Sequence, residues 1–184
     1  AYDEARQRVV LFGGDAGDNH DVLTVPLGDT WEYDGTTWIP VTTTSAPTPR
    51  GEHALGYDAR RQRVVLFGGF DGTGTLNDTW EYDGTSWTPI TTSLAPPPRF
   101  RADLVWDPNR ERLVLFPGRL AAGDARQIWE WDGSDWEEIQ VPNHPASRTE
   151  YRVSYDSWRR AFLLYSGDAG RTDLWRFAWQ SALP

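Results

Sequence analysis

Three arginines recur at one interval along the chain. Arg50, Arg99 and Arg148 follow one another at a spacing of 49 residues. A guanidinium group binds a carboxylate through two parallel hydrogen bonds, so three arginines around one opening could hold an acidic ligand. The other interpretation, which we favour, is structural: each arginine binds a carbonyl or carboxylate group of a neighbouring element. Three residues beside them differ from repeat to repeat, as residues that confer specificity would: His53, Arg101 and Glu150.

Three aspartates stand in one polar segment, at positions 15, 18 and 21. Asp15, Asp18 and Asp21 could gather around calcium, which prefers hard oxygen ligands. Their spacing is not that of an EF-hand loop, and a solvated acidic loop is the simpler interpretation. They are therefore only a weak candidate for a metal site, and we expect no cofactor.

Composition excludes several kinds of chemistry. The chain of 184 residues contains no cysteine, which rules out disulfides, thiolate metal sites and cysteine nucleophiles. No nucleophile elbow, P-loop or zinc-protease helix motif occurs, and none of the 27 acidic residues stands out as half of a catalytic pair. We therefore expect a protein that is not an enzyme.

The net charge of −9 argues against a nucleic-acid-binding surface, because such surfaces carry clustered basic residues. No apolar run approaches the ~18–20 residues that span a bilayer. The absence of cysteine and the acidic charge are compatible with export, which slightly favours an extracellular or periplasmic location. No signal peptide is visible, and we expect the natural start to lie outside this sequence.

A repeat of about 49 residues organises the whole chain. An apolar run appears four times, as VVLFGG at 9–14 and 64–69, LVLFPG at 113–118 and FLLYSG at 162–167. A second string follows each copy: TWEYDGTTW, TWEYDGTSW, IWEWDGSDW and a degraded LWRFAW. We place the repeats at approximately 1–41, 51–90, 100–139 and 149–184, within one domain spanning 1–184.

Each repeat predicts four short strands. The apolar run is too short for a helix and rich in β-branched residues, which indicates a strand covered on both faces. The following string alternates aromatic and acidic residues, and its Asp-Gly pair predicts a type I′ hairpin turn. Pro40 and Pro89 place the fourth strand on a sheet edge, because proline cannot donate to a ladder.

A glycine pair after an apolar strand, followed by aromatic residues at fixed distances, resembles the kelch repeat, in its bacterial type. The resemblance covers essentially the whole chain and implies an all-β fold, a β-propeller of four-stranded blades. It would contain about four blades, with the first and last incomplete at three strands each. In this family the enzymatic precedent is a copper oxidase with a Tyr–Cys crosslink, which a chain without cysteine cannot form.

The incomplete ends leave three interpretations open. The chain is a fragment of a larger propeller, or two copies pair into one larger ring, or it is an unusual open or four-bladed monomer. Exposed terminal blade edges favour a partner there, because unpaired strands aggregate. Self-association through the incomplete blades is therefore one expected interaction.

The loops predict which end of the propeller binds. Connections between strands one and two and between strands three and four are uniform. Those between strands two and three and from each blade to the next vary, and the candidate binding end displays 15–29, 70–78, 119–127 and 168–172. Variable loops usually carry function, and kelch domains commonly bind ligands with this face. The leading hypothesis is a protein- or peptide-binding module; the alternatives are carbohydrate binding, as an inactive relative of the secreted oxidases, and a purely structural assembly segment. The repeated tryptophans are expected between blades, and Trp158, on a predicted turn, is the expected exposed aromatic residue.

Overall fold

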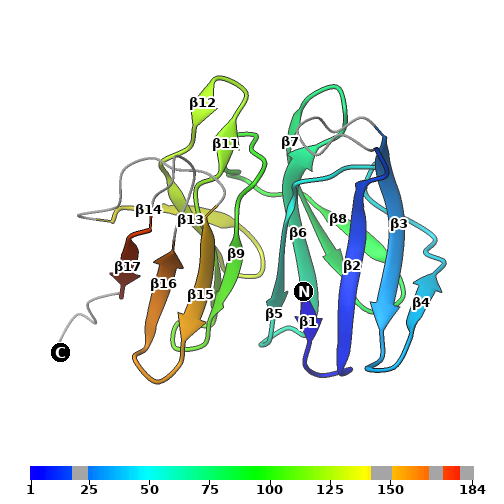
Figure 1. Cartoon of the computed structure of the whole chain (residues 1–184), viewed down its shortest axis with the longest axis horizontal. Coiled ribbons are helices and arrows are strands. Elements are labelled where there is room, and N and C mark those ends of the chain that lie inside the picture. The colour runs from blue at the N-terminus through cyan, green and yellow to red at the C-terminus, as the bar shows by residue number, and fades with distance from the viewer. Residues whose placement is uncertain (18–24, 142–150, 166–171, 179–184) are drawn as a thin grey trace.

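The computed structural model describes residues 1–17, 25–141, 151–165 and 172–178. These residues form strands, turns and loops, with no helix among them, so no described helix is long and apolar enough to cross a membrane. Four antiparallel sheets follow one another along the chain as the four blades of a β-propeller (Figure 1). The predicted all-β propeller is confirmed.

The first two blades each contain four strands in meander order. Blade 1 consists of β1 (Tyr2–Asp3), β2 (Arg8–Asp15), β3 (Pro26–Tyr33) and β4 (Trp38–Val41). Blade 2 consists of β5 (Ala54–Asp58), β6 (Arg63–Phe70), β7 (Thr75–Tyr82) and β8 (Trp87–Ile90). Pro40 and Pro89 lie in β4 and β8, at the outer edge of their sheets, as predicted.

The last two blades depart from this pattern. Blade 3 consists of β9 (Leu104–Asp107), β10 (Arg112–Leu115), β13 (Ile128–Trp131) and β14 (Trp136–Ile139), with an added hairpin of β11 (Arg119–Leu120) and β12 (Gly123–Asp124). Blade 4 has three strands among the described residues: β15 (Arg152–Asp156), β16 (Ala161–Tyr165) and β17 (Leu174–Phe177). The prediction of three strands in blade 1 was wrong, because the two residues of β1 pair with β2 and complete the sheet.

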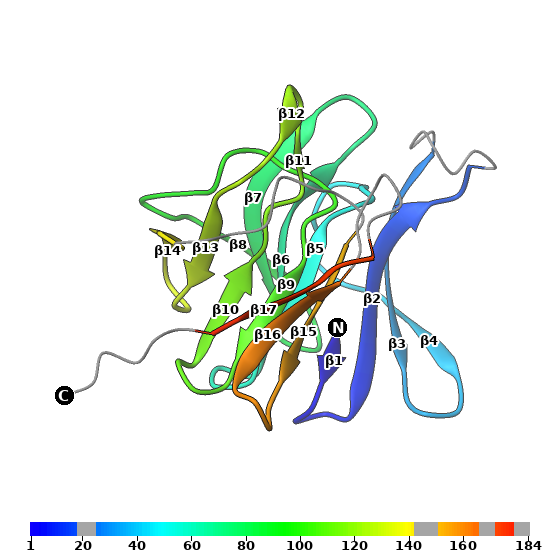
Figure 2. The ribbon, with the colours of Figure 1, turned by 60° about the vertical axis from the view of Figure 1, so that its left-hand side comes forward.

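The blades stand side by side with their first strands innermost, in the order β1, β5, β9 and β15 (Figure 2). Three clusters of buried apolar side chains join them. One cluster packs blade 1 against blade 2, one packs blade 2 against blade 3, and one packs blade 3 against blade 4. The core of this molecule therefore lies between sheets, and the repeated tryptophans Trp87 and Trp136 are buried in it, as expected.

The uniform loops between first and second strands form ion pairs with the third strand of their own blade. Arg6 donates to the buried carboxylate of Glu32 (2.5 Å), and Arg61 and Arg110 pair in the same way with Glu81 and Glu130. Gly84 and Gly133 of the following blades lie against Arg6 and Arg61. Such ion pairs repeat from blade to blade because they belong to the scaffold.

The glycine pairs form bulges within a continuing hairpin and do not reverse the chain. The register shifts between Phe67 and Gly69, after which β6 and β7 pair again up to Phe70 and Thr75. Gly68 has a φ of 63°, and a Cβ there would lie 2.6 Å from the carbonyl oxygen of Arg99. Glycine is required because the loop from the next blade touches the backbone at this point. The loop predicted over 70–78 is consequently much shorter.

The Asp-Gly turns also differ from the predicted type I′ form. Gly35 has a φ of 99°, but Asp34 keeps a negative φ, whereas a type I′ turn needs positive φ at both residues. The connection is a four-residue loop, closed by a bond from Asp34 N to Thr37 O (3.2 Å). The Asp34 carboxylate accepts from the backbone N–H groups of Thr36 and Thr37, so this aspartate serves as a loop cap. Asp83 and Asp132 repeat this geometry.

Candidate functional site

Two of the three repeated arginines are buried between blades. Arg50 is 1% exposed, and all of its guanidinium nitrogens donate hydrogen bonds within the protein. Nη1 and Nη2 bind the two carboxylate oxygens of Asp78 (2.6 and 2.9 Å), while Nε and Nη2 bind the carbonyl and hydroxyl oxygens of Thr48. Nη1 also donates to Gly68 O in the bulge (3.0 Å). Arg50 therefore fixes the loop that enters blade 2.

Arg99 occupies the equivalent position at the entrance to blade 3, where its hydrogen-bond acceptors are uncharged carbonyl oxygens. It is fully buried and donates to the carbonyl oxygens of Pro97, Pro117 and Gln127, at 3.1, 3.2 and 3.0 Å. Gln127 occupies the position of Asp78, and its side-chain oxygen and the Nη2 of Arg99 both have no hydrogen-bond partner. Burial lowers the pKa of Arg99 to about 10. Neither arginine faces an opening, so an exposed arginine ring containing both is not formed.

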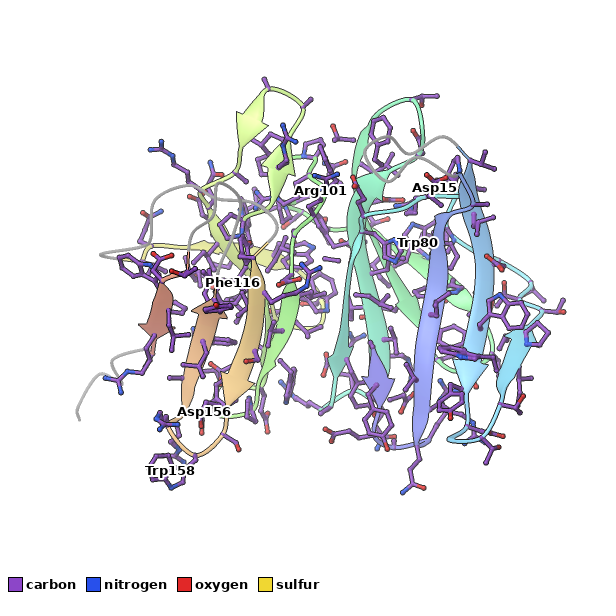
Figure 3. The ribbon with its side chains drawn as sticks, viewed as in Figure 1. Asp15, Trp80, Arg101, Phe116, Asp156 and Trp158 are labelled. Atoms are coloured by element: carbon purple, nitrogen blue, oxygen red, sulfur yellow. The ribbon has the colours of Figure 1, made fainter. Side chains whose placement is uncertain are left out.

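A cavity of about 580 Å³ lies next to these loops, where the inner strands begin. Its lining consists of Glu52, His53, Arg101, Ala102, Asp103 and Arg152. These residues precede or open β5, β9 and β15, so the cavity lies at one end of the propeller axis. Figure 3 shows Arg101 at the same end as the β11–β12 hairpin and the β6–β7 connection. The cavity, the β6–β7 connection and the β11–β12 hairpin thus share one end of the molecule.

Glu52 and Arg101 form the rim of this cavity at equivalent positions of two repeats. Arg101 Nε donates to Glu52 Oε1 (2.7 Å), and Arg101 N donates to Glu52 O (2.8 Å). Both residues have left-handed backbone, with φ values of 56° and 55°. This conformation costs a residue with a side chain about 1–3 kcal/mol and is concentrated at functional sites. The two loops therefore keep a strained geometry that presents these side chains together.

Asp103 and Arg152 are the other charged residues that line the cavity. Burial raises the pKa of Asp103, and a hydrogen bond from Val153 N (2.9 Å) and the charge of Arg152 oppose this only in part. Arg152 is exposed, and its Nη1 donates to Tyr151 O (2.8 Å). Two arginines line the cavity. Arg101 is paired with Glu52, and Arg152 is the more exposed of the two.

His53 also lines the cavity. Its ring stands edge-on to Phe12 with a centroid distance of 5.7 Å, and its Nδ1 has no hydrogen-bond partner. Burial and the nearby charge of Arg50 lower the pKa of His53 to about 4. The imidazole is consequently neutral near pH 7 and can accept or donate one hydrogen bond.

The other predicted site residues lie elsewhere. Trp158 is 82% exposed, as expected, but it occupies the turn between β15 and β16 at the opposite end of the molecule from Arg101 (Figure 3). Its partner there is Arg159, whose guanidinium carbon lies 4.7 Å from the ring centre. Trp158 and the cavity therefore do not form one site.

Several predictions fall on residues outside the described part of the chain. These residues are Arg148, Glu150, Asp18 and Asp21. The remaining member of the calcium hypothesis, Asp15, accepts bonds from the backbone N–H groups of Gly17 and Val25, as a loop cap does. Among the described residues there is no group of three potential metal ligands.

Sequence reasoning missed three charged residues of the cavity, Glu52, Asp103 and Arg152, and the apolar Ala102. Glu52 could have been found, because it stands 49 residues before Arg101, at the same repeat position. Asp103 and Arg152 could not, because they come together only through the packing of β9 against β15.

Comparison with known proteins agrees with this architecture. A search of curated proteins found no match to the chain. A family model described as the KLHDC2/KLHL20/DRC7 Kelch-repeats domain matches residues 1–181. Kelch domains are in general protein-interaction modules without catalytic activity. With four kelch-type blades and a match over nearly its whole length, the chain belongs to the Kelch-repeats domain family.

Proposed function

We propose that this domain binds a partner protein through an acidic segment that enters the cavity at the end of the propeller axis. The observation that carries this proposal is that Arg152 is exposed in the lining of a cavity where the other arginine, Arg101, is already paired with Glu52. A carboxylate would pair with Arg152, since guanidinium groups bind carboxylates through parallel hydrogen bonds. Neutral His53, which also lines the cavity, would supply a further polar contact to the bound segment.

The strained rim supports the same proposal. Glu52 and Arg101 hold each other at the edge of the cavity, so their side chains need not be ordered when a peptide arrives. Preorganised groups improve affinity because binding then costs less conformational entropy. The β6–β7 connection and the β11–β12 hairpin at this end are dissimilar and would contact the flanking residues of the peptide.

The test is a selection from a displayed library of random peptides on the immobilised chain. We expect peptides enriched in aspartate or glutamate on the wild-type chain, and loss of that enrichment with Arg152→Glu. The matched control is Arg60→Glu, which makes the same charge change at an exposed residue of the loop between β5 and β6. Acidic peptides that bind the Arg152→Glu chain as well as the wild type would refute the cavity as their site.

A further inference from the structure

One face of blade 1 exposes apolar side chains that the repeat buries everywhere else. We call the face of a blade that packs on the preceding blade its leading face, and the opposite one its trailing face. Val9, Leu11 and Trp38 lie on the leading face of blade 1, with exposed fractions of 37%, 41% and 45%. Their counterparts in blade 2 are Val64, Leu66 and Trp87, at 0%, 0% and 1%.

The exposed face already has the arrangement of a covered one. The rings of Tyr33 and Trp38 lie 5.3 Å apart at 38°. The equivalent pair in blade 2, Tyr82 and Trp87, lies 5.0 Å apart at 31° beneath blade 1. No rearrangement of this pair is needed before another sheet packs on blade 1.

The repeat shows what covers such a face, because blade 1 itself covers blade 2. Phe12 stands edge-on to Trp87 at 5.3 Å, and Thr30 Oγ1 accepts a bond from Trp87 Nε1 (3.0 Å). Glu32 Oε1 accepts a bond from the hydroxyl of Tyr82 (2.9 Å). On a trailing face, phenylalanine thus packs against the leading face opposite, while threonine and glutamate accept hydrogen bonds from its buried donors.

The same solution appears between blades 2 and 3. Phe67 stands edge-on to Trp136 at 5.1 Å, and Thr79 Oγ1 accepts from Trp136 Nε1 (2.9 Å). Since a buried donor without an acceptor destabilises an interface, the threonine is part of the fit and not an incidental neighbour.

The trailing face of blade 4 lacks these acceptors. Tyr165, Leu174 and Arg176 occupy the positions of Phe12, Thr30 and Glu32. Leucine cannot accept the tryptophan N–H, and arginine offers a tyrosine hydroxyl a donor in place of a carboxylate. A second copy that presented blade 4 would therefore leave the indole N–H of Trp38 without an acceptor, whereas the hydroxyl of Tyr33 already donates to Gly35 O (2.9 Å).

We propose that the leading face of blade 1 is a docking surface for another kelch-type blade, one whose trailing face carries phenylalanine, threonine and glutamate. The threonine and glutamate stand two residues apart on its third strand, as in β3 and β7. Blade 4 of a second copy is not that partner. Specificity comes from the indole N–H of Trp38, which a covering face without an acceptor would bury unsatisfied.

The experiment supplies such a blade directly. A copy of residues 50–104 is joined in front of Ala1, so that Leu104 precedes Ala1 as it precedes the equivalent Val105. Oxidation by hydroxyl radicals, read by mass spectrometry, reports the exposure of Trp38, with Trp136 as buried and Trp158 as exposed reference in the same molecule. We expect the oxidation rate of Trp38 to fall to that of Trp136.

The matched control carries Thr79→Leu and Glu81→Arg in the added copy only, which installs the residues of blade 4. We expect it to leave Trp38 as reactive as in the unextended chain. Equal protection by both copies would overturn the proposal, because any apolar sheet would then suffice.

Two further results would also overturn it. One is a Trp38 that stays reactive in the chain with the unaltered copy, and this result counts whether or not the added copy is folded. Hydrogen exchange reports the folding of the added copy: if the β6 peptides, which both copies share, give a single mass envelope, the added copy is folded like the original. The other is a dimer of the unextended chain, seen by light scattering, in which Trp38 is already protected.

Discussion

Replacing Asp78 with glutamine would remove the carboxylate that neutralises Arg50. The change copies blade 3, where Gln127 stands at this position. Arg50 would remain 1% exposed but would lose two bonds to a charged acceptor. We expect a destabilised fold with unchanged secondary structure.

The magnitude follows from the burial of the two partners. Removing one member of a buried ion pair costs about 3–5 kcal/mol, because the other charge stays buried without compensation. The side chain of Asp78 is 41% exposed, so water can replace part of the lost contact. We therefore expect a loss of about 2–3 kcal/mol in the free energy of unfolding, and a fall in Tm of about 4–12 °C.

Urea and thermal unfolding followed by tryptophan fluorescence measure this loss. The reciprocal variant Gln127→Asp gives Arg99 the missing carboxylate and should raise stability by about 1 kcal/mol. A loss below about 0.5 kcal/mol for Asp78→Gln would refute the reasoning, because it would place the variant among ordinary surface substitutions.

The pH dependence provides a second measure of the same pair. Burial raises the pKa of Asp78, but the hydrogen bonds and charge of Arg50 outweigh it and hold the pKa below its usual range. A carboxylate with a depressed pKa contributes stability above its unfolded pKa of about 3.9, and that stability is lost as the pH falls through the folded value. Asp78→Gln should therefore lose stability near neutral pH and differ less from the wild type in acid.

Two further perturbations test the packing of the loops. Gly68→Ala should destabilise the fold by about 2–4 kcal/mol, because it combines a positive φ with a Cβ that meets the carbonyl oxygen of Arg99; Gly74→Ala, in open space, is the matched control in urea unfolding, and equal effects would refute the close approach. His53→Gln should abolish a loss of stability between pH 6.5 and 4: the folded pKa of about 4 lies below the unfolded value, so the unfolded chain takes up the proton first as the pH falls. An unchanged pH profile of stability in the His53→Gln chain would show that His53 is not buried in its neutral form.

Much of the fold could be predicted because the residues within each repeat determine its local structure. The apolar runs gave the central strands, and Pro40 and Pro89 marked the outer edges. The aromatic spacing placed Trp87 and Trp136 between blades. These features depend on period, on β-propensity and on the missing N–H of proline, all of which act within a few residues of one another.

These local patterns did not predict the structure where one blade contacts the next. The glycine pairs form bulges because the loops that carry Arg50 and Arg99 approach the backbone there, which no local pattern indicates. The Asp-Gly pairs suggested a two-residue turn, but the aspartate side chain caps a longer loop.

The sequence by itself determined a four-blade kelch propeller and the end of it that carries the variable loops. Only the tertiary structure decided that Arg50 and Arg99 are buried, that Arg101 and Arg152 line a common cavity, and that Trp38 is exposed where Trp87 is covered. The reason is physical: identical residues in successive repeats have the same local preferences. Their burial and charge environment depend on the neighbouring blade, which lies about one repeat away in the chain.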